Sequence, residues 1–142
     1  MENRSFYNTI LTEHNLHPLH KQVLKDANLA LEGVNPSCGD DIILQLKVED
    51  GKIKDGAFSG SGCAISQAST DMMLDLIIGK TKEEALKLSE IFLKMIHDEA
   101  VPEEIELLEE ASSLQDISHM PSRVKCAVLG WRTMKEMFGH KE

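Results

Sequence analysis

The sequence lacks any long apolar run. Its longest such run, residues 72–78, contains Asp75 and is far shorter than the roughly 18–20 residues that a membrane-spanning helix requires. The first four residues, Met1-Glu2-Asn3-Arg4, do not have the charged segment and following apolar segment of a secretory signal. We therefore expect a protein that is neither inserted in a membrane nor secreted, and that works in the cytoplasm.

Positive charge is also scarce. The 24 acidic residues outnumber the 15 lysines and arginines, which gives a formal net charge of −9. A protein that binds the phosphate backbone of a nucleic acid needs lysine and arginine clustered on one face. The charge balance therefore argues against a nucleic-acid partner.

Two common catalytic or nucleotide-binding motifs are missing as well. Gly60 and Gly62 lack the spacing of a G-x-G-x-x-G loop, and no Lys-Ser or Lys-Thr pair directly follows their loop, so we expect no nucleotide site. No G-x-S-x-G sequence occurs, which makes Ser61 a loop residue rather than a nucleophile.

The three cysteines do not form a C-x₂-C pair, which is the usual local sign of a metal site. Three cysteines cannot all pair within one chain, and thiols stay reduced in the cytosol. These cysteines therefore need an explanation other than a disulfide framework.

What the sequence does contain is the composition of a folded domain. Its 142 residues suit one domain, residues 1–142, with a core large enough to need no disulfide or metal staple. Apolar residues and glycine together make up about 48% of the chain, which is the norm for globular proteins.

The N-terminal part of the chain predicts one helix followed by three strands. Residues 4–16 have apolar side chains at helical spacing, and Pro18 ends that helix. Asp50-Gly51 is a two-residue hairpin turn, because both positions tolerate a positive φ. Alternating apolar residues around it predict three strands, over residues 28–34, 42–49 and 52–59.

From residue 64 onward the spacing is helical. Gly79 suits the left-handed end of the first of these helices, and Thr81 with Glu84 forms a capping box at the start of the next. Two prolines stand where the first residue of a helix belongs, Pro102 and Pro121. The order predicts an α+β fold, an antiparallel sheet of about three strands with helices packed on it.

The cysteines occupy positions that this fold would bring together. Cys38 precedes the predicted hairpin and Cys63 follows it, while Cys126 lies about one turn into the last helix. Asp40 follows Cys38 by two residues, and positions i and i+2 of an extended backbone point to one side. Three thiolates and one carboxylate would suit a tetrahedral metal, and thiolates favour Zn²⁺ or an iron–sulfur cluster.

The local settings of two cysteines favour thiolates. Cys63 stands at a helix start, where free N–H groups stabilise an anion. Arg123 and Lys125 lie close to Cys126 in sequence, and such cations lower the pKa of a thiol. The alternative is that all three cysteines are small buried apolar residues, since free cysteine is among the most buried residue types. The residues alone leave both interpretations open.

Three segments resemble one protein family. They are residues 35–42 (Asn-Pro-Ser-Cys-Gly-Asp-Asp-Ile), 60–66 (Gly-Ser-Gly-Cys-Ala-Ile-Ser) and 123–127 (Arg-Val-Lys-Cys-Ala). In order and spacing they are similar to the iron–sulfur cluster assembly proteins of the IscU/SufU type (NifU N-terminal-like family). The resemblance covers nearly the whole chain, although the residues after Pro18 depart from the usual pattern.

Two details are similar to the SufU branch. Lys125 stands where the IscU branch has a histidine ligand, and no Pro-Pro-Val-Lys chaperone motif precedes it. The 62 residues between Cys63 and Cys126 exceed the IscU spacing, and residues 99–117 look like the SufU-type insertion.

The resemblance implies a zinc-dependent acceptor of persulfide sulfur from a SufS-like cysteine desulfurase. It implies that Cys38, Asp40, Cys63 and Cys126 hold Zn²⁺ and that Cys38 accepts the sulfur. Other Suf assembly proteins and apo iron–sulfur clients are further expected partners. Such a protein is a sulfurtransferase-like partner of the desulfurase rather than a stand-alone enzyme.

The same ligands leave a second function open. The chain could instead be a scaffold on which an iron–sulfur cluster is assembled and passed to apo-proteins. Lys125 in place of histidine favours sulfur transfer, because one ligand of the IscU type is then missing.

Two further groups of residues each have two interpretations. His14, His17 and His20 lie at i, i+3 and i+6, a spacing that would suit a second metal site on a helix. Pro18 interrupts the helix that would align them, so we interpret them as isolated surface residues. The acidic run at residues 103–110 is typical of a solvated face, with a docking surface for a basic partner as the alternative.

Overall fold

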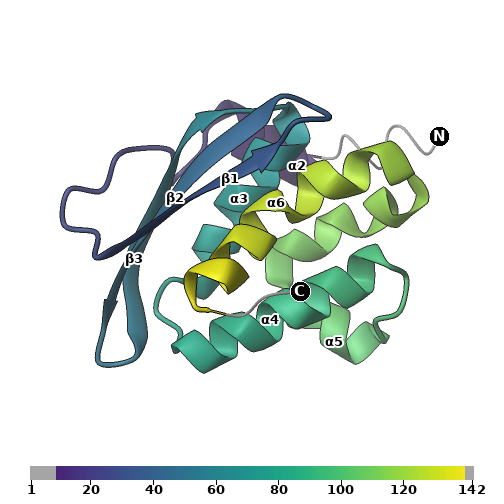
Figure 1. Ribbon diagram of the computed structural model, residues 1–142. Coiled ribbons are helices and arrows are strands. Elements are labelled where there is room, and N and C mark those ends of the chain that lie inside the picture. The colour runs from purple at the N-terminus through teal and green to yellow at the C-terminus, as the bar shows by residue number, and fades with distance from the viewer. Residues whose placement is uncertain (1–8, 140–142) are drawn as a thin grey trace.

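A computed structural model describes residues 9–139. Its elements are helix α2 (Thr9–Leu16), strands β1 (Leu29–Asn35), β2 (Asp40–Glu49) and β3 (Lys52–Ser61), helices α3 (Ala64–Ile77), α4 (Lys82–Ile96) and α5 (Pro102–Glu106), the 3₁₀ helix η1 (Glu109–His119) and helix α6 (Pro121–Met137). The helices gather on one side of the sheet (Figure 1).

The sheet has the predicted three antiparallel strands, in the order β1-β2-β3. On the central strand Ile42, Leu44 and Leu46 are buried, while Ile43 between them is 42% exposed. This alternation is the period-2 pattern of a strand with one covered face. The predicted α+β architecture is therefore confirmed.

The turn at Asp50-Gly51 also forms as predicted. Both residues have positive φ, 54° and 77°, and Glu49 pairs with Lys52 across a two-residue loop. This turn returns β3 along β2, so that Ser61, at the end of β3, lies opposite Asp41 near the start of β2. The two ends of the hairpin are therefore adjacent in space.

Helix α6 packs directly on β1, and a side chain at Gly33 of that strand would overlap Thr133 of α6. On its other side, α6 contacts α4 through stacked rings of Trp131 and Phe92, whose centroids are 4.1 Å apart. The capping box of α4 is present, with Thr81 Oγ1 accepting from the Glu84 amide and Glu84 Oε1 accepting from the Thr81 amide. These contacts fix α6 against the sheet, and with it the position of Cys126.

The first predicted helix, over residues 4–16, is seen as α2 from Thr9 to Leu16, and residues 4–8 lie outside the described part of the chain. It ends before Pro18, as predicted. The interpretation of His14 as a surface residue is wrong. The residue is 6% exposed, and its ring hydrogen-bonds to Asp71 of α3 and Glu110 of η1, each at 2.6 Å.

The acidic run at residues 103–110 is only partly solvated. Glu104 pairs with Lys94 of α4 at 2.7 Å, and Glu110 pairs with His14. These two carboxylates attach the segment that contains α5 and η1 to the body of the protein. No helix within residues 9–139 is long and apolar enough to cross a membrane.

The His14 contacts predict a specific pH dependence of stability. Burial by itself lowers the pKa of His14, but its hydrogen bonds to Glu110 and Asp71 outweigh burial and hold that pKa above the ordinary value of 6.5. A raised folded-state pKa means that the contribution of His14 to stability is complete below about pH 6.5 and is lost as the pH rises through the folded pKa. His14→Ala should therefore destabilise by about 3 kcal/mol at pH 6, and by less at pH 9.

Urea unfolding of the wild type and His14→Ala across this pH range measures that difference. His17→Ala, at an exposed histidine three residues away, is the matched control and should change stability little at any pH. A destabilisation by His14→Ala that is constant from pH 6 to 9 would contradict the charged-histidine interpretation.

Candidate metal centre

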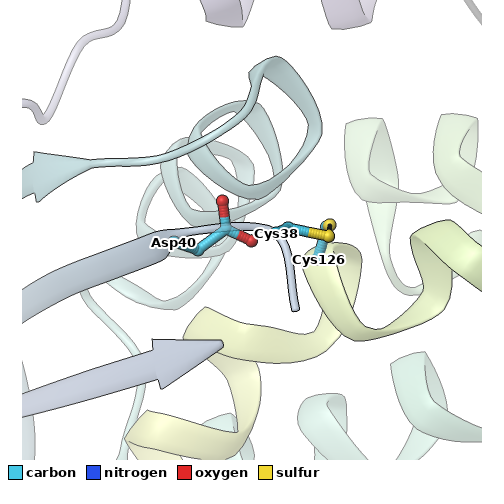
Figure 2. A group of neighbouring side chains, drawn as sticks. All are labelled: Cys38, Asp40 and Cys126. Carbon is cyan, nitrogen blue, oxygen red and sulfur yellow. Dashed lines mark hydrogen bonds between the residues drawn. The ribbon is translucent and has the colours of Figure 1, made fainter. Parts of the chain in front are cut away.

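Three of the four expected ligands meet at one end of the sheet. Cys38 lies in the loop between β1 and β2, Asp40 is the first residue of β2, and Cys126 lies in the second turn of α6. One donor atom from each residue lies within 4.8 Å of the other two. Figure 2 shows both sulfur atoms side by side, with one carboxylate oxygen of Asp40 directed toward them. The sulfur atoms of Cys38 and Cys126 are 3.1 Å apart.

The convergence of Cys38 and Asp40 has a different cause from the expected one. Residues 36–39 form a turn, and Gly39 has a φ of 73°, so Cys38-Gly39-Asp40 is not extended backbone. Glycine reaches this left-handed conformation without the steric cost of a Cβ. The tight loop folds the Cys38 side chain back toward the start of β2, and so the two residues still meet.

Cys63 lies beside this group rather than within it. It is the N-cap of α3, as expected, and its sulfur accepts a hydrogen bond from the Ser66 amide at 3.4 Å. Its backbone amide donates to Asp40 Oδ1 at 2.8 Å. Among the described residues, the compact group of donor atoms therefore contains Cys38, Asp40 and Cys126, with Cys63 adjacent.

The Asp40 carboxylate is completely buried, with three donors around it. Oδ1 accepts hydrogen bonds from the Cys63 amide and from the Ser66 hydroxyl at 3.2 Å, and Oδ2 accepts one from Asn35 Nδ2 at 3.3 Å. A buried charge is tolerated only when it is paired or hydrogen-bonded. These donors therefore let a carboxylate exist at this depth.

The Cys126 thiol is also completely buried. Burial, together with the neighbouring Cys38, Cys63 and Asp40, raises its pKa well above the ordinary range for a thiol. The expectation that Arg123 and Lys125 would lower this pKa is wrong. Lys125 is exposed, and Arg123 lines a small surface pocket of about 130 Å³ with Cys63, so neither cation offsets the burial of Cys126.

This donor set fits a zinc ion. Zn–S bonds are about 2.3 Å and Zn–O bonds about 2.0–2.2 Å, so two ligands of one ion lie within about 4.6 Å of each other. The three donor atoms already approach this separation. Thiolates and a carboxylate in such close contact repel one another, and a bound divalent cation removes that repulsion.

Asn35 and Ser66 contact these side chains, although the motifs alone did not indicate a role for either residue. Both are buried, and both donate hydrogen bonds to Asp40. Their sequence signal was their place within the segments around Cys38 and Cys63. Only the fold shows that their side chains point toward the carboxylate.

Comparison with known proteins shows which family the chain belongs to. A family profile, the NifU-like N-terminal domain, matches residues 6–137. The chain is 43% identical over 130 residues to the iron–sulfur cluster assembly scaffold protein IscU of Streptococcus pyogenes, and this match covers 92% of this chain and 80% of that protein. It is 36% identical over 138 residues to the zinc-dependent sulfurtransferase SufU of Bacillus subtilis, and that match covers 97% of this chain and 92% of the relative.

Solved structures share the fold. A protein described as an iron–sulfur cluster assembly scaffold for the SUF system of Fervidobacterium islandicum superposes with a TM-score of 0.87 at 35% identity, covering 93% of this chain and 96% of that one. A NifU-like N-terminal protein of Brucella abortus gives the same TM-score of 0.87 at 19% identity, covering 98% and 96%, and shows the fold alone. Over nearly its whole length, the chain therefore belongs to the NifU-like N-terminal domain family, together with the IscU and SufU proteins.

Proposed function

We propose that this protein takes part in iron–sulfur cluster assembly as a zinc-dependent acceptor of persulfide sulfur from a SufS-like cysteine desulfurase. The observation that carries this proposal is that the Cys38 and Cys126 sulfur atoms lie close to the buried Asp40 carboxylate. The likeness to the Bacillus subtilis zinc-dependent sulfurtransferase, which extends over 97% of this chain, supports the choice of zinc and of sulfur transfer.

The metal ligands in this proposal are Cys38, Asp40, Cys63 and Cys126. Zn²⁺ bound there keeps thiols ionised at neutral pH, which the buried Cys126 by itself resists. Cys63 completes the set from the N-cap of α3, where the helix N-terminus also favours a thiolate. Asp40 is the only oxygen donor in the set, and we assign it as the ligand that a docked partner displaces.

Cys38 is assigned as the sulfur acceptor. Its neighbours Pro36, Ser37 and Gly39 are exposed, whereas Cys126 is buried and the Cys63 sulfur accepts a hydrogen bond inside the α3 cap. In the transfer step the Cys38 thiolate attacks the terminal sulfur of the desulfurase persulfide. A new S–S bond forms to Cys38, the old S–S bond breaks, and the desulfurase cysteine leaves as a thiolate. No external oxidant or reductant is needed.

A scaffold function is the second candidate, because the same residues would hold an iron–sulfur cluster. The relatives from Streptococcus pyogenes and Thermotoga maritima, at 43% and 49% identity, are named as cluster assembly scaffold proteins. Lys125 is exposed rather than directed into the ligand group, and this favours sulfur transfer over a cluster of the IscU type, which has a histidine ligand at that position.

The remaining assignments follow from the same proposal. We place the reaction in the cytoplasm, with other Suf assembly proteins and apo iron–sulfur clients as downstream partners. We treat residues 1–142 as one domain, in which residues 99–117 are a SufU-type insertion carrying α5 and most of η1.

Metal analysis of the purified protein, combined with a desulfurase assay with and without it, tests the proposed function. Sulfur transfer predicts about one zinc ion per chain and strong stimulation of a SufS-like desulfurase. Iron and labile sulfide without stimulation would instead establish the scaffold function and overturn the acceptor.

A further inference from the structure

Asn35 joins two of the proposed ligands that come from different elements. It is the last residue of β1 and pairs with Asp40, the first residue of β2, across the loop that carries Cys38. Its side-chain nitrogen Nδ2 lies 3.3 Å from Asp40 Oδ2 and 3.8 Å from the Cys126 sulfur. Asn35 is 6% exposed, so solvent competes little for these contacts.

The two oxygens of the Asp40 carboxylate are not equivalent. Oδ1 accepts two hydrogen bonds, from the Cys63 amide and the Ser66 hydroxyl, and a carboxylate oxygen has about two acceptor positions. Among residues 9–139, Oδ2 accepts a hydrogen bond only from Asn35, which leaves one of its acceptor positions for a metal. In Figure 2 one oxygen is directed toward the two sulfur atoms and the other away from them.

We infer that Asn35 is a positioning residue. Its side chain makes Oδ2 the single metal-binding oxygen of Asp40 and holds this oxygen in a fixed position relative to the Cys126 sulfur. This inference rests on the proposed zinc site and adds to it a residue outside the ligand set. By holding Oδ2 from β1 while the start of α3 holds Oδ1, the protein fixes the plane of the carboxylate from both sides. Asp40 then binds the metal through one oxygen, and it has hydrogen-bond partners that retain it when it leaves the metal.

The chemistry of the Asn35 side chain is specific to this role. An aspartate at the same place would have the same size but would place a second carboxylate beside Asp40. A leucine would fill a similar volume without a donor. Partners of metal ligands commonly contribute about 10- to 100-fold to metal affinity. Asn35→Leu should therefore weaken zinc binding by about that factor while the fold is retained.

A double-mutant cycle tests whether Asn35 acts through Asp40. Zinc affinity is measured by competition with a chromophoric chelator for the wild type, Asn35→Leu, Asp40→Ala and the double variant. Because Asp40 carries the effect, adding Asn35→Leu to Asp40→Ala should change affinity by no more than about twofold, the usual error of additivity. In the cobalt-substituted proteins, Asn35→Leu should also shift the visible d–d bands, which report ligand geometry.

Ser69→Ala is the matched control. Ser69 is also completely buried, its hydroxyl donates to the Ala127 carbonyl at 2.6 Å and accepts from Trp131 Nε1 at 3.0 Å, and it contacts none of the proposed ligands by these bonds. This variant should lower the melting temperature of the metal-free protein and leave zinc affinity and the cobalt spectrum unchanged.

Three results would overturn the inference. If the wild type binds zinc tightly and Asn35→Leu binds it equally well, Asn35 has no positioning role, although the proposed function stands. If the losses from Asn35→Leu and Asp40→Ala multiply, Asn35 acts independently of Asp40. If the wild type binds no zinc, the proposed metal site fails, and this inference fails with it.

Discussion

Cys38→Ser should reduce the stimulation of a cysteine desulfurase to the rate of the desulfurase alone. The attacking group in persulfide transfer is a thiolate, and a serine hydroxyl is not ionised at neutral pH. Cys38 lies in an exposed loop at the rim of the ligand group, whereas Cys126 is buried and cannot replace it as the site of attack. All stimulation should therefore be lost, even when the variant still binds the desulfurase.

Desulfurase turnover at saturating cysteine measures this loss, with zinc content determined on the same samples. Mass spectrometry of the wild type should find one additional sulfur atom, about 32 Da, on the peptide containing Cys38. Ser37→Ala, in the same loop, is the matched control and should stimulate normally. Cys38→Ser should also compete with the wild type for the desulfurase, which shows that it still folds and docks. Stimulation by Cys38→Ser, or an adduct found only on Cys63 or Cys126, would contradict the assignment.

Cys126→Ser and Cys63→Ser should each lose most of the bound zinc and melt at a lower temperature than the zinc-loaded wild type. A ligand that binds only the folded state contributes about 4 kcal/mol of stability at a concentration of about 1,000 times Kd. For a chain of this size each kcal/mol shifts Tm by about 2–4 °C. Loss of the metal should therefore lower Tm by about 10 °C.

Melting curves with added zinc and with EDTA separate loss of metal from damage to the fold. In EDTA the variants and the wild type should melt within a few degrees of one another, since none then holds metal. Inductively coupled plasma analysis gives the zinc content directly. If both variants retain one zinc per chain and the Tm of the zinc-loaded wild type, Cys63 and Cys126 are not ligands.

The local features of the fold were predictable because each depends on a few neighbouring residues. The alternation of Ile42, Leu44 and Leu46 predicts a strand with one buried face, and Asp50-Gly51 predicts the turn after it. Thr81 with Glu84 predicts the start of α4, since their side chains satisfy amides that a helix end leaves open. Strand ends were less predictable, and β2 begins at Asp40 rather than at the predicted residue 42.

The candidate site was predictable in its residue types but not in its environment. The loop around Cys38 was expected to be extended, and the positive φ of Gly39 forms a turn there instead. The pKa of Cys126 was expected to fall because cations are near it in sequence. This pKa rises instead, because Cys126 is buried. Sequence distance along a helix does not show which side of the helix faces the core.

The sequence by itself determined the order of the three strands and the α-helices, and the residues able to bind a soft metal. These properties follow from backbone preferences and side-chain chemistry within a short stretch of chain. Only the tertiary structure decided that Cys38 and Cys126, 88 residues apart, lie with their sulfurs 3.1 Å from each other. It alone buried Asp40 beneath Asn35 and Ser66, and His14 between Asp71 and Glu110. Burial and long-range hydrogen bonds arise only when α6, α3 and the sheet pack together, because that packing excludes water and leaves each polar group with partners from distant segments.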